Sequence, residues 1–337
     1  MELLFPVRSY EQAVSYVHNG IKELYCGYIN NKWITHFNKK HETQIVTLQI
    51  SLNRRDYLTS NITDFRELEQ ICKLCKNNNV TIFMTLNAAF YSEFAYELID
   101  EWLLEIEKAG IEHIIISDIG MMSYIAKNYS NFKITVSCEN QVINSSAVKF
   151  YKQFYPERIV FPRHITVKEM ESIIAEYPEM EFESFLISSR CIYDDGNCRC
   201  IHDIEPICSE AWITKFYSTD GHNQSITENR ILKNAAQDMT DYIFGIEQST
   251  YHGLGYGKAL CSICSAYNLS KYTNFASLKV VGRGMRIPDQ DIEYLKTIID
   301  LSQHSKNIQD YRDIAQKMMG YENLCQGYFY CCTRGEE

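Results

Sequence analysis

The stretch RIVFPRHITVKEMESIIAEYPEMEFESFLIS (residues 158–188) reads as a strand, a helix and a second strand in succession. Residues 158–163 and 180–188 are apolar runs of the length and composition typical of buried strands. Residues 166–177 between them have the apolar spacing of an amphipathic helix. A unit of this kind places its two strands parallel, joined by a right-handed crossover.

The same alternation extends in both directions along the chain. Further strands are predicted at residues 3–7, 23–27, 80–87, 111–118, 132–139 and 276–282, and residues 44–50 also have strand character. Further helices are predicted at residues 10–20, 62–79, 94–110, 120–129, 144–155 and 289–303, whereas 33–60 is less regular. About eight strands in repeated β–α units fit an α/β fold of the (β/α)8 TIM-like barrel type better than an open sheet.

The predicted organisation is a barrel over residues 1–305, with a cysteine-rich loop after the seventh strand and a polar, aromatic insert at 209–258. Residues 306–337 would then form a short C-terminal extension with a helix and a second group of cysteines, Cys325, Cys331 and Cys332. These thiols could supply a metal ligand or a second metal site, or be incidental.

Composition and charge narrow the functional class. The chain has 337 residues, 45% hydrophobic and 23% charged, which is ordinary for a soluble globular protein. The chain has 33 lysines and arginines and 43 aspartates and glutamates, which gives a net charge of −10. This acidic balance argues against a nucleic-acid partner, because phosphate binding needs a basic surface. The N-terminus lacks a secretory signal and no stretch is long enough to span a membrane, so we expect a cytoplasmic protein with mostly reduced thiols.

Cysteines gather directly after the strand at 180–188. Cys191, Cys198, Cys200 and Cys208 lie within eighteen positions, around the turn-forming Asp194-Asp195-Gly196. Thiolates that converge either pair in an oxidising compartment or hold a soft metal. In a reducing compartment the metal is the better interpretation, and four thiolates suit either an iron–sulfur cluster or tetrahedral zinc. Cys72 and Cys75 show the same close spacing but lie on a predicted amphipathic helix, where we expect them in the core.

Polar residues follow most of the predicted strands. In a barrel the carboxyl ends of the strands meet at one face, where functional residues sit. Those ends carry Asn87, Asp118, Glu139 with Asn140, Arg163 with His164, the Cys191 loop, and Lys279 with Arg283.

Several of these residues also match a known family. Glu183, Phe185, Cys191, Gly196 and Cys198 have the order and spacing of the diagnostic segment of peptidase family U32, the collagenase-like proteins, which the chain therefore resembles. Supporting matches are Leu278-Lys-Val-Val-Gly-Arg283, Asp118-Ile-Gly120, Val160-Phe-Pro-Arg163 and Asn87. The departures are Ser188-Ser189 for His-Gly, His164 for Glu, Ser137-Cys138-Glu139 for Ser-Thr-Gln, and Val281 for an acid, so the chain resembles a divergent member.

The resemblance implies a function that the peptidase name does not suggest. Several family members look like oxygen-independent hydroxylases that carry a 4Fe-4S cluster on four cysteines, with prephenate as the suggested oxygen donor. The length and acidity of this chain resemble the short branch that acts on small molecules, so we expect a small-molecule or peptide substrate. By the family pattern the cluster ligands are Cys191, Cys198, Cys208 and Cys261, with Cys200 and Cys264 as competitors and zinc as the alternative metal.

The polar residues at the strand ends are then candidates for binding and catalysis next to that cluster. The candidates for binding substrate or a carboxylated donor are Asn87, Arg163, Lys279 and Arg283. The candidates for proton transfer are Asp118, Glu139 and His164. Two other functions stay open: a peptidase, although the chain has no nucleophile elbow and no His-Glu-x-x-His, and a non-catalytic cluster-bearing subunit that works with a related chain.

Overall fold

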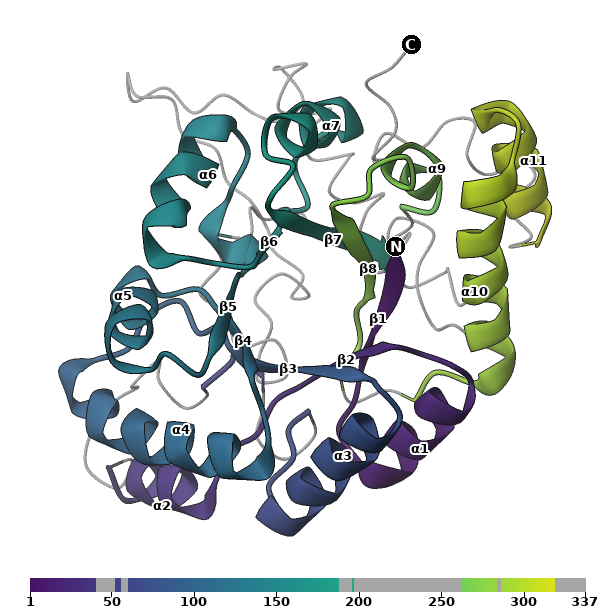
Figure 1. The fold of residues 1–337 in the computed structure, drawn as a ribbon. Coiled ribbons are helices and arrows are strands. Elements are labelled where there is room, and N and C mark those ends of the chain that lie inside the picture. The colour runs from purple at the N-terminus through teal and green to yellow at the C-terminus, as the bar shows by residue number, and fades with distance from the viewer. Residues whose placement is uncertain (41–51, 56–59, 188–195, 197–261, 284–285, 319–337) are drawn as a thin grey trace, which may run out of the picture.

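The protein forms a closed barrel of eight parallel strands surrounded by helices (Figure 1). This computed structural model describes residues 1–40, 52–55, 60–187, 196, 262–283 and 286–318. The strands are β1 (Glu2–Pro6), β2 (Glu23–Cys26), β3 (Thr81–Leu86), β4 (His113–Ile116), β5 (Lys133–Val136), β6 (Arg158–Val160), β7 (Glu181–Ile187) and β8 (Phe275–Val280). Each strand pairs with the next, and β8 pairs with β1 to close the ring. The predicted (β/α)8 barrel is confirmed.

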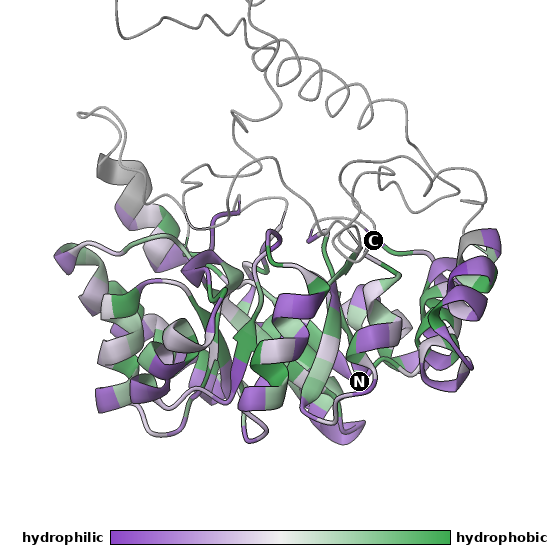
Figure 2. Ribbon diagram, turned by 90° about the horizontal axis from the view of Figure 1, so that it is seen from above, coloured by the Kyte–Doolittle hydropathy of each residue, from purple (hydrophilic) through white to green (hydrophobic). Residues whose placement is uncertain are grey.

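Helices cover the outside of the barrel. They are α1 (Tyr10–His18), α2 (Asn31–Lys40), α3 (Phe65–Asn77), α4 (Tyr96–Ala109), α5 (Ile119–Asn128), α6 (Ser145–Tyr151), α7 (Val167–Glu176), α9 (Ser265–Leu269), α10 (Asp289–His304) and α11 (Ile308–Met318). Their apolar faces point inward: on α4, for example, Ile99, Trp102, Leu103 and Ile106 are buried at helical spacing. Figure 2 shows hydrophobic residues concentrated on the strands and on the helix faces turned to them. Within the part of the chain that the structure describes, every helix is too short or too polar to cross a bilayer.

Several element boundaries differ from the sequence prediction for identifiable reasons. The helix expected at 62–79 begins at Phe65, because Ile62 bridges Tyr28 and Asp64 caps the helix through the Arg66 N–H. The helix expected at 144–155 ends at Tyr151 and continues as the short 3-10 helix η3 (Lys152–Phe154). The possible strand at 44–50 lies outside the described residues, and the barrel closes without it because β2 pairs directly with β3.

The described part of the C-terminal segment packs on the barrel. Tyr311 of α11 is fully buried, its hydroxyl donates to the carbonyl of Ile263 at 2.8 Å, and its ring stacks on Tyr267. The described part of this segment therefore contains one helix, α11. The domain boundary at 305 stays a prediction, and the insert at 209–258 and the cysteines of the tail lie outside the described residues.

The cysteines on α3 belong to the hydrophobic core, as predicted. Cys72 and Cys75 are buried against Cys26 of β2 and the surrounding aliphatic side chains. Burial raises the pKa of both Cys72 and Cys75 to about 12, so these thiols stay protonated at neutral pH.

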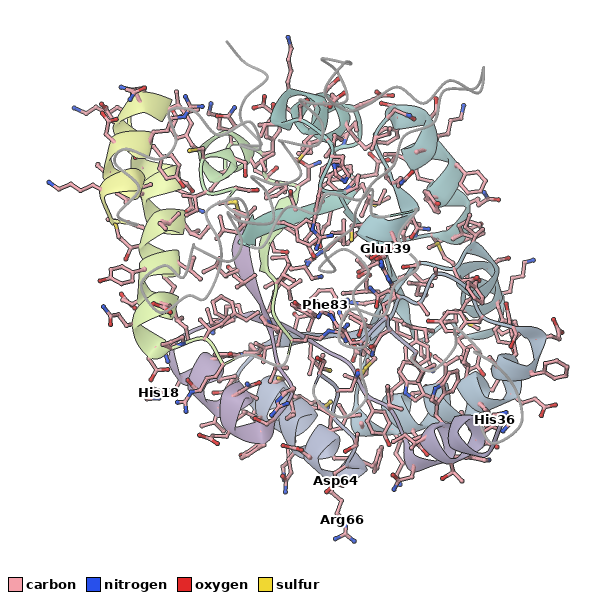
Figure 3. All side chains as sticks on the ribbon, turned by 180° about the vertical axis from the view of Figure 1, so that it is seen from behind. His18, His36, Asp64, Arg66, Phe83 and Glu139 are labelled. Atoms are coloured by element: carbon pink, nitrogen blue, oxygen red, sulfur yellow. The ribbon has the colours of Figure 1, made fainter. Side chains whose placement is uncertain are left out.

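The barrel interior is layered. A hydrophobic layer of Leu4, Tyr25, Phe83 and Ile115 lies across the middle of the barrel, between charged side chains near the amino ends of the strands and a cavity at the carboxyl ends. Figure 3 shows Phe83 and Glu139 inside the ring of strands, whereas His18, His36, Asp64 and Arg66 lie on the periphery.

Candidate functional site

A cavity of about 80 Å³ opens at the carboxyl ends of the barrel strands. This is the face at which barrel enzymes carry their active sites. The cavity lining is strongly cationic, because it contains Arg54, Arg55, Arg163, Lys279 and Arg283, with Glu139 as the acid among the described lining residues. Such a lining favours an anionic ligand, since arginine and lysine bind carboxylates and phosphates through charge-assisted hydrogen bonds.

The cavity brings together five of the seven binding and proton-transfer residues predicted from the sequence. They are Asn87, Glu139, Arg163, Lys279 and Arg283. Asn87, Glu139 and Arg163 follow β3, β5 and β6, whereas Lys279 lies in β8 and Arg283 follows it. The closure of the barrel brings these four strands to one place. The structure places these residues at a common site, and the individual roles stay predictions.

Glu139 forms an ion pair with Arg54 across the mouth of the barrel. Glu139 belongs to the short 3-10 helix η2 (Cys138–Asn140) after β5, and Arg54 lies in the connection between α2 and α3. Both side chains are largely buried, with 12% and 8% of their surface exposed. Arg54 has a left-handed backbone with φ of 60°, and Gln141, two residues after Glu139, has φ of 50°. Strained backbone on both sides of an ion pair is typical of a functional site.

Lys279 forms the floor of the cavity from β8. Its Nζ donates to Glu183 Oε1 at 3.0 Å and lies 4.3 Å from the centroid of the Tyr25 ring. Burial raises the pKa of Tyr25 to about 12, so the ring stays neutral, and its hydroxyl donates to the Val280 carbonyl. The ammonium is thus held between a carboxylate and an aromatic face, which are both favourable partners for a cation.

Arg283 holds a neighbouring segment in place. Its Nη1 donates to Thr85 Oγ1 at 2.7 Å, its Nη2 donates to the Asn53 carbonyl at 3.1 Å, and its own carbonyl accepts from Ser60. Gly27 makes this convergence possible, because a β-carbon there would lie 2.5 Å from Arg283 Nη1. The position of Arg283 therefore fixes the chain beside Arg54 as well as lining the cavity.

Asn87 and Arg163 complete the predicted cavity residues. The Oδ1 of Asn87 is buried and accepts no hydrogen bond from the described residues, so it is available to a hydroxyl or amino group of a ligand. The Arg163 guanidinium lies 4.0 Å from the centroid of the Phe185 ring, and both side chains line the cavity.

Asp118 and His164 lie off the cavity. Asp118 caps α5, since its carboxylate accepts a hydrogen bond from the Met121 N–H at 2.6 Å. This bond gives the carboxylate a structural role at the start of the helix. His164 is exposed and is not among the residues that line the cavity. Their proposed part in proton transfer stays a prediction that the geometry does not favour.

The predicted cluster ligands Cys191, Cys198, Cys208 and Cys261 lie outside the described residues, as does Cys200, while Cys264 is buried at the start of α9. Two described contacts locate the chain around them. Gly196, between Cys191 and Cys198, packs against Gln141, since a β-carbon on it would lie 2.7 Å from the Gln141 Cγ. The Ser262 N–H, next to Cys261, donates to the Leu186 carbonyl in β7 at 2.9 Å. Gly196 and Ser262 therefore both lie near the carboxyl ends of the barrel strands.

The sequence did not predict Arg54 and Arg55 in the cavity lining, or the role of Glu183 next to it. Arg54 lies in a region that reads as irregular, and no local signal places it across the mouth. Glu183 was noted only as part of the U32 resemblance, although an acid in the middle of a buried strand is itself a signal for a paired, inward-facing charge.

Comparison with known proteins identifies relatives along most of the chain. The family described as Peptidase family U32 matches residues 8–335. A tRNA hydroxylation protein P of Haemophilus influenzae is 29% identical over 85 residues, covering 25% of this chain and 18% of that protein. A tRNA hydroxylation protein P1 of Bacillus subtilis is 24% identical over 176 residues, covering 49% of this chain and 41% of that protein. A collagenase of Porphyromonas gingivalis is 24% identical over 172 residues, covering 51% of this chain and 35% of that protein.

The matched segments thus span less than half the length of these relatives. Among solved structures, the U32 peptidase Mk0906 has a TM-score of 0.41 at 11% identity, covering 56% of this chain and 69% of that one. A D-psicose 3-epimerase has a TM-score of 0.37 at 9% identity, covering 97% of this chain and 100% of that one. Neither likeness is close enough to carry an argument about function.

Proposed function

Because the chain belongs to peptidase family U32, we propose that it is an iron–sulfur-dependent hydroxylase that works without molecular oxygen. The observation that carries the proposal is the cationic cavity at the barrel mouth, next to Gly196 of the predicted cluster loop. Relatives named tRNA hydroxylation proteins in three bacteria support hydroxylation over proteolysis.

The thiols of the chain fit a 4Fe-4S cluster by their chemistry. Cys191, Cys198, Cys208 and Cys261 are soft donors. Their described neighbours Gly196 and Ser262 contact Gln141 and Leu186 at the barrel mouth. Such a cluster, when bound, would supply one-electron transfer. Zinc on the same thiols is the alternative that the experiment below excludes or supports.

The cavity residues would bind the hydroxyl donor and hold protons. Hydroxylation replaces C–H by C–OH and removes two electrons from the substrate, and a hydroxylated donor that loses its hydroxyl takes up those two electrons. Lys279 and Arg163 would bind the carboxylates of such a donor, for which prephenate is the candidate. Asn87 would accept a hydrogen bond from its hydroxyl, and Glu139 would exchange a proton at the mouth.

The substrate that receives the hydroxyl has two candidates. The net charge of −10 favours a small molecule, whereas the names of the relatives point to a nucleoside of tRNA.

A peptidase mechanism has less support, because none of the residues that line the cavity in the described part of the chain is a histidine that could activate Ser137 or Cys138.

The test begins with anaerobic purification of the whole chain and measurement of iron, acid-labile sulfide and zinc. We expect a brown protein with equal amounts of iron and sulfide, reduced iron in Cys191→Ser and Cys198→Ser, and unchanged iron in Cys72→Ser, whose thiol lies in the core. A colourless zinc protein that cleaves gelatin would refute the proposal.

The second stage supplies prephenate and either bulk tRNA or a small-molecule extract under anaerobic conditions. Mass spectrometry should find the gain of one oxygen atom in one of the two pools, and loss of that product in Lys279→Met. A cluster-loaded protein that turns over only after a related chain is added would identify it as a subunit of a hetero-oligomer.

A further inference from the structure

Strand β7 carries an unusual residue into the barrel interior. Glu183 is fully buried, with 0% of its surface exposed, two positions after Glu181 at the start of the strand. Side chains two apart on a strand point to the same face, so both acids face inward, followed by Phe185 in the cavity wall. Barrel interiors are normally filled by branched apolar residues, and a buried carboxylate is costly unless it is paired.

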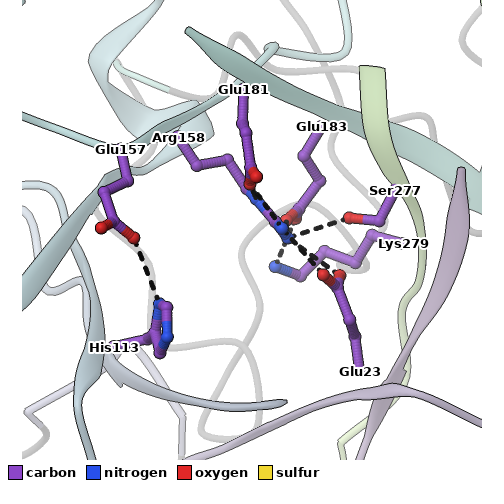
Figure 4. A network of polar contacts seen from close by, with 8 residues as sticks. All are labelled: Glu23, His113, Glu157, Arg158, Glu181, Glu183, Ser277 and Lys279. Carbon is purple, nitrogen blue, oxygen red and sulfur yellow. Dashed lines mark hydrogen bonds and ion pairs between the residues drawn. The ribbon is translucent and has the colours of Figure 1, made fainter. Parts of the chain in front are cut away.

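The two oxygens of Glu183 bind two different cations (Figure 4). Oε1 accepts from Lys279 Nζ at 3.0 Å, and Oε2 accepts from Arg158 Nη1 at 3.3 Å. Lys279 lines the cavity, whereas Arg158 lies at the first position of β6, toward the other end of the barrel. Glu183 therefore links the cavity floor to the charged layer beneath it.

Arg158 is itself immobilised. Its guanidinium forms two bonds to Glu23, at 2.8 and 2.9 Å, and a further bond to Ser277 at 3.1 Å, and it lies 4.7 Å from the centroid of the Phe83 ring. The charge of Arg158 is already matched by Glu23, so its burial does not require Glu183. What Glu183 adds is a contact to the cation that faces the cavity.

We propose that Glu183 is a positioning residue, which fixes the Lys279 ammonium at the cavity floor so that it meets an anionic reactant. The inference rests on the proposed function only in taking that reactant to be anionic. Glu183 acts through Lys279 and is itself not in contact with the cavity. The Tyr25 ring holds the ammonium from a second side, so its position is set by the barrel rather than by the ligand.

The test uses two variants that differ in one contact. Glu183→Gln and Glu23→Gln each remove a carboxylate from Arg158, but only Glu183 touches Lys279. The anaerobically purified full chain is labelled with trace acetic anhydride, with and without malonate as a small dicarboxylate probe. Acetylation of Lys279 is read by peptide mass spectrometry, and the free energy of unfolding is measured in parallel by urea denaturation.

We expect Lys279 to be acetylated about tenfold faster in Glu183→Gln than in the natural chain, because the ammonium loses its charge-assisted hydrogen bond. Malonate should protect Lys279 in the natural chain and in Glu23→Gln, and protect it several-fold less in Glu183→Gln. Equal effects of both variants on Lys279, or none in Glu183→Gln, would overturn the inference.

Glu183→Asp covers the case in which Glu183→Gln does not fold. It keeps the charge but is shorter by one methylene, so it should raise the acetylation of Lys279 while retaining most of the stability. Failure of malonate to protect Lys279 in the natural chain would count against the anion site itself. A changed acetylation rate without malonate would still support the positioning role.

Discussion

Arg158 and Glu23 form a two-bond ion pair across the barrel, with Nη1–Oε2 at 2.9 Å and Nη2–Oε1 at 2.8 Å. The pair joins β6 to β2, which lie on opposite sides of the eight-strand ring. Only 6% of the Arg158 side chain and 11% of the Glu23 side chain are exposed. Burial alone would lower the pKa of Arg158, but the carboxylates around it, Glu23 first, raise that pKa, so the guanidinium stays charged.

Arg158→Met should lower the free energy of unfolding by about 3–5 kcal/mol, because it leaves Glu23 and Glu183 as buried carboxylates without their shared cation. Urea denaturation at neutral pH measures the change. Lys152→Met is the control, since it breaks the exposed ion pair to Glu179 and should have a much smaller effect. Equal losses in the two variants would contradict the buried pair.

Stability should depend on pH through His113, at the start of β4. Burial, assisted by the nearby charges of Lys133 and Arg158, lowers the pKa of His113 from 6.5 to about 4. Glu157, 3.8 Å from Nδ1, is half-exposed and does not offset this effect. Between pH 6.5 and 4 the unfolded chain binds a proton that the folded chain does not, so the free energy of unfolding falls as the pH falls, by about 3 kcal/mol in all.

The measurement is urea denaturation at pH 7 and pH 5. His113→Gln should flatten the pH dependence in this range, whereas His304→Gln, at an exposed position of α10, should preserve it. A slope that persists unchanged in His113→Gln would show that another group is responsible.

Gly27→Ala should disturb the segment that carries Arg54. A β-carbon at this position would lie 2.0 Å from Asn61 Oδ1 and 2.4 Å from Asn53 Nδ2, so those side chains and Arg283 must move. We expect a loss of about 1–3 kcal/mol from overpacking, and faster hydrogen exchange in peptides that contain Asn53 and Asn61.

Gly20→Ala is the matched control for that substitution. Gly20 has φ of 80° but no atom within 4 Å of a β-carbon, so alanine there costs backbone strain alone, about 1 kcal/mol. Hydrogen exchange around Asn53 should then match the natural chain. If both alanine variants accelerate exchange around Asn53 equally, the close approach at Gly27 is not what holds the segment.

The core thiols should resist alkylation. Because burial raises the pKa of Cys72 and Cys75 to about 12 and that of Cys26 as well, little thiolate is present at pH 8. Iodoacetamide should label these three cysteines only after unfolding in urea, as peptide mass spectrometry would show. Rapid labelling of Cys72 in the native protein would contradict their place in the core.

The barrel was predictable from the sequence because short apolar runs alternate regularly with amphipathic helices. The helix α2 was missed because its sequence, Asn31–Lys40, is mostly polar, and among residues 31–36, whose side chains are described, Trp33 alone is fully buried. The available signal was Asn30, whose Oδ1 accepts from the Trp33 N–H at 2.8 Å at the start of the helix.

The site was predictable only in part. A polar residue after a strand either faces the cavity, as Asn87 and Lys279 do, or caps the next helix, as Asp118 does, and a single sequence does not separate these outcomes. Arg54 lies in the long connection between α2 and α3, and it contacts Glu139 only because that connection folds across the barrel mouth. Interactions of this kind depend on the closed ring, which no local pattern encodes.

The hydrogen bond from Ser262 to Leu186 has a practical consequence for engineering. The chain leaves the barrel after β7 and returns at Ser262 to the same strand, so the exit and return points are neighbours in space. We therefore expect that a short linker of glycine and serine can join Ile187 to Ser262 without altering the register of the described strands. The stability of such a shortened chain would show how far the barrel folds independently of residues 188–261.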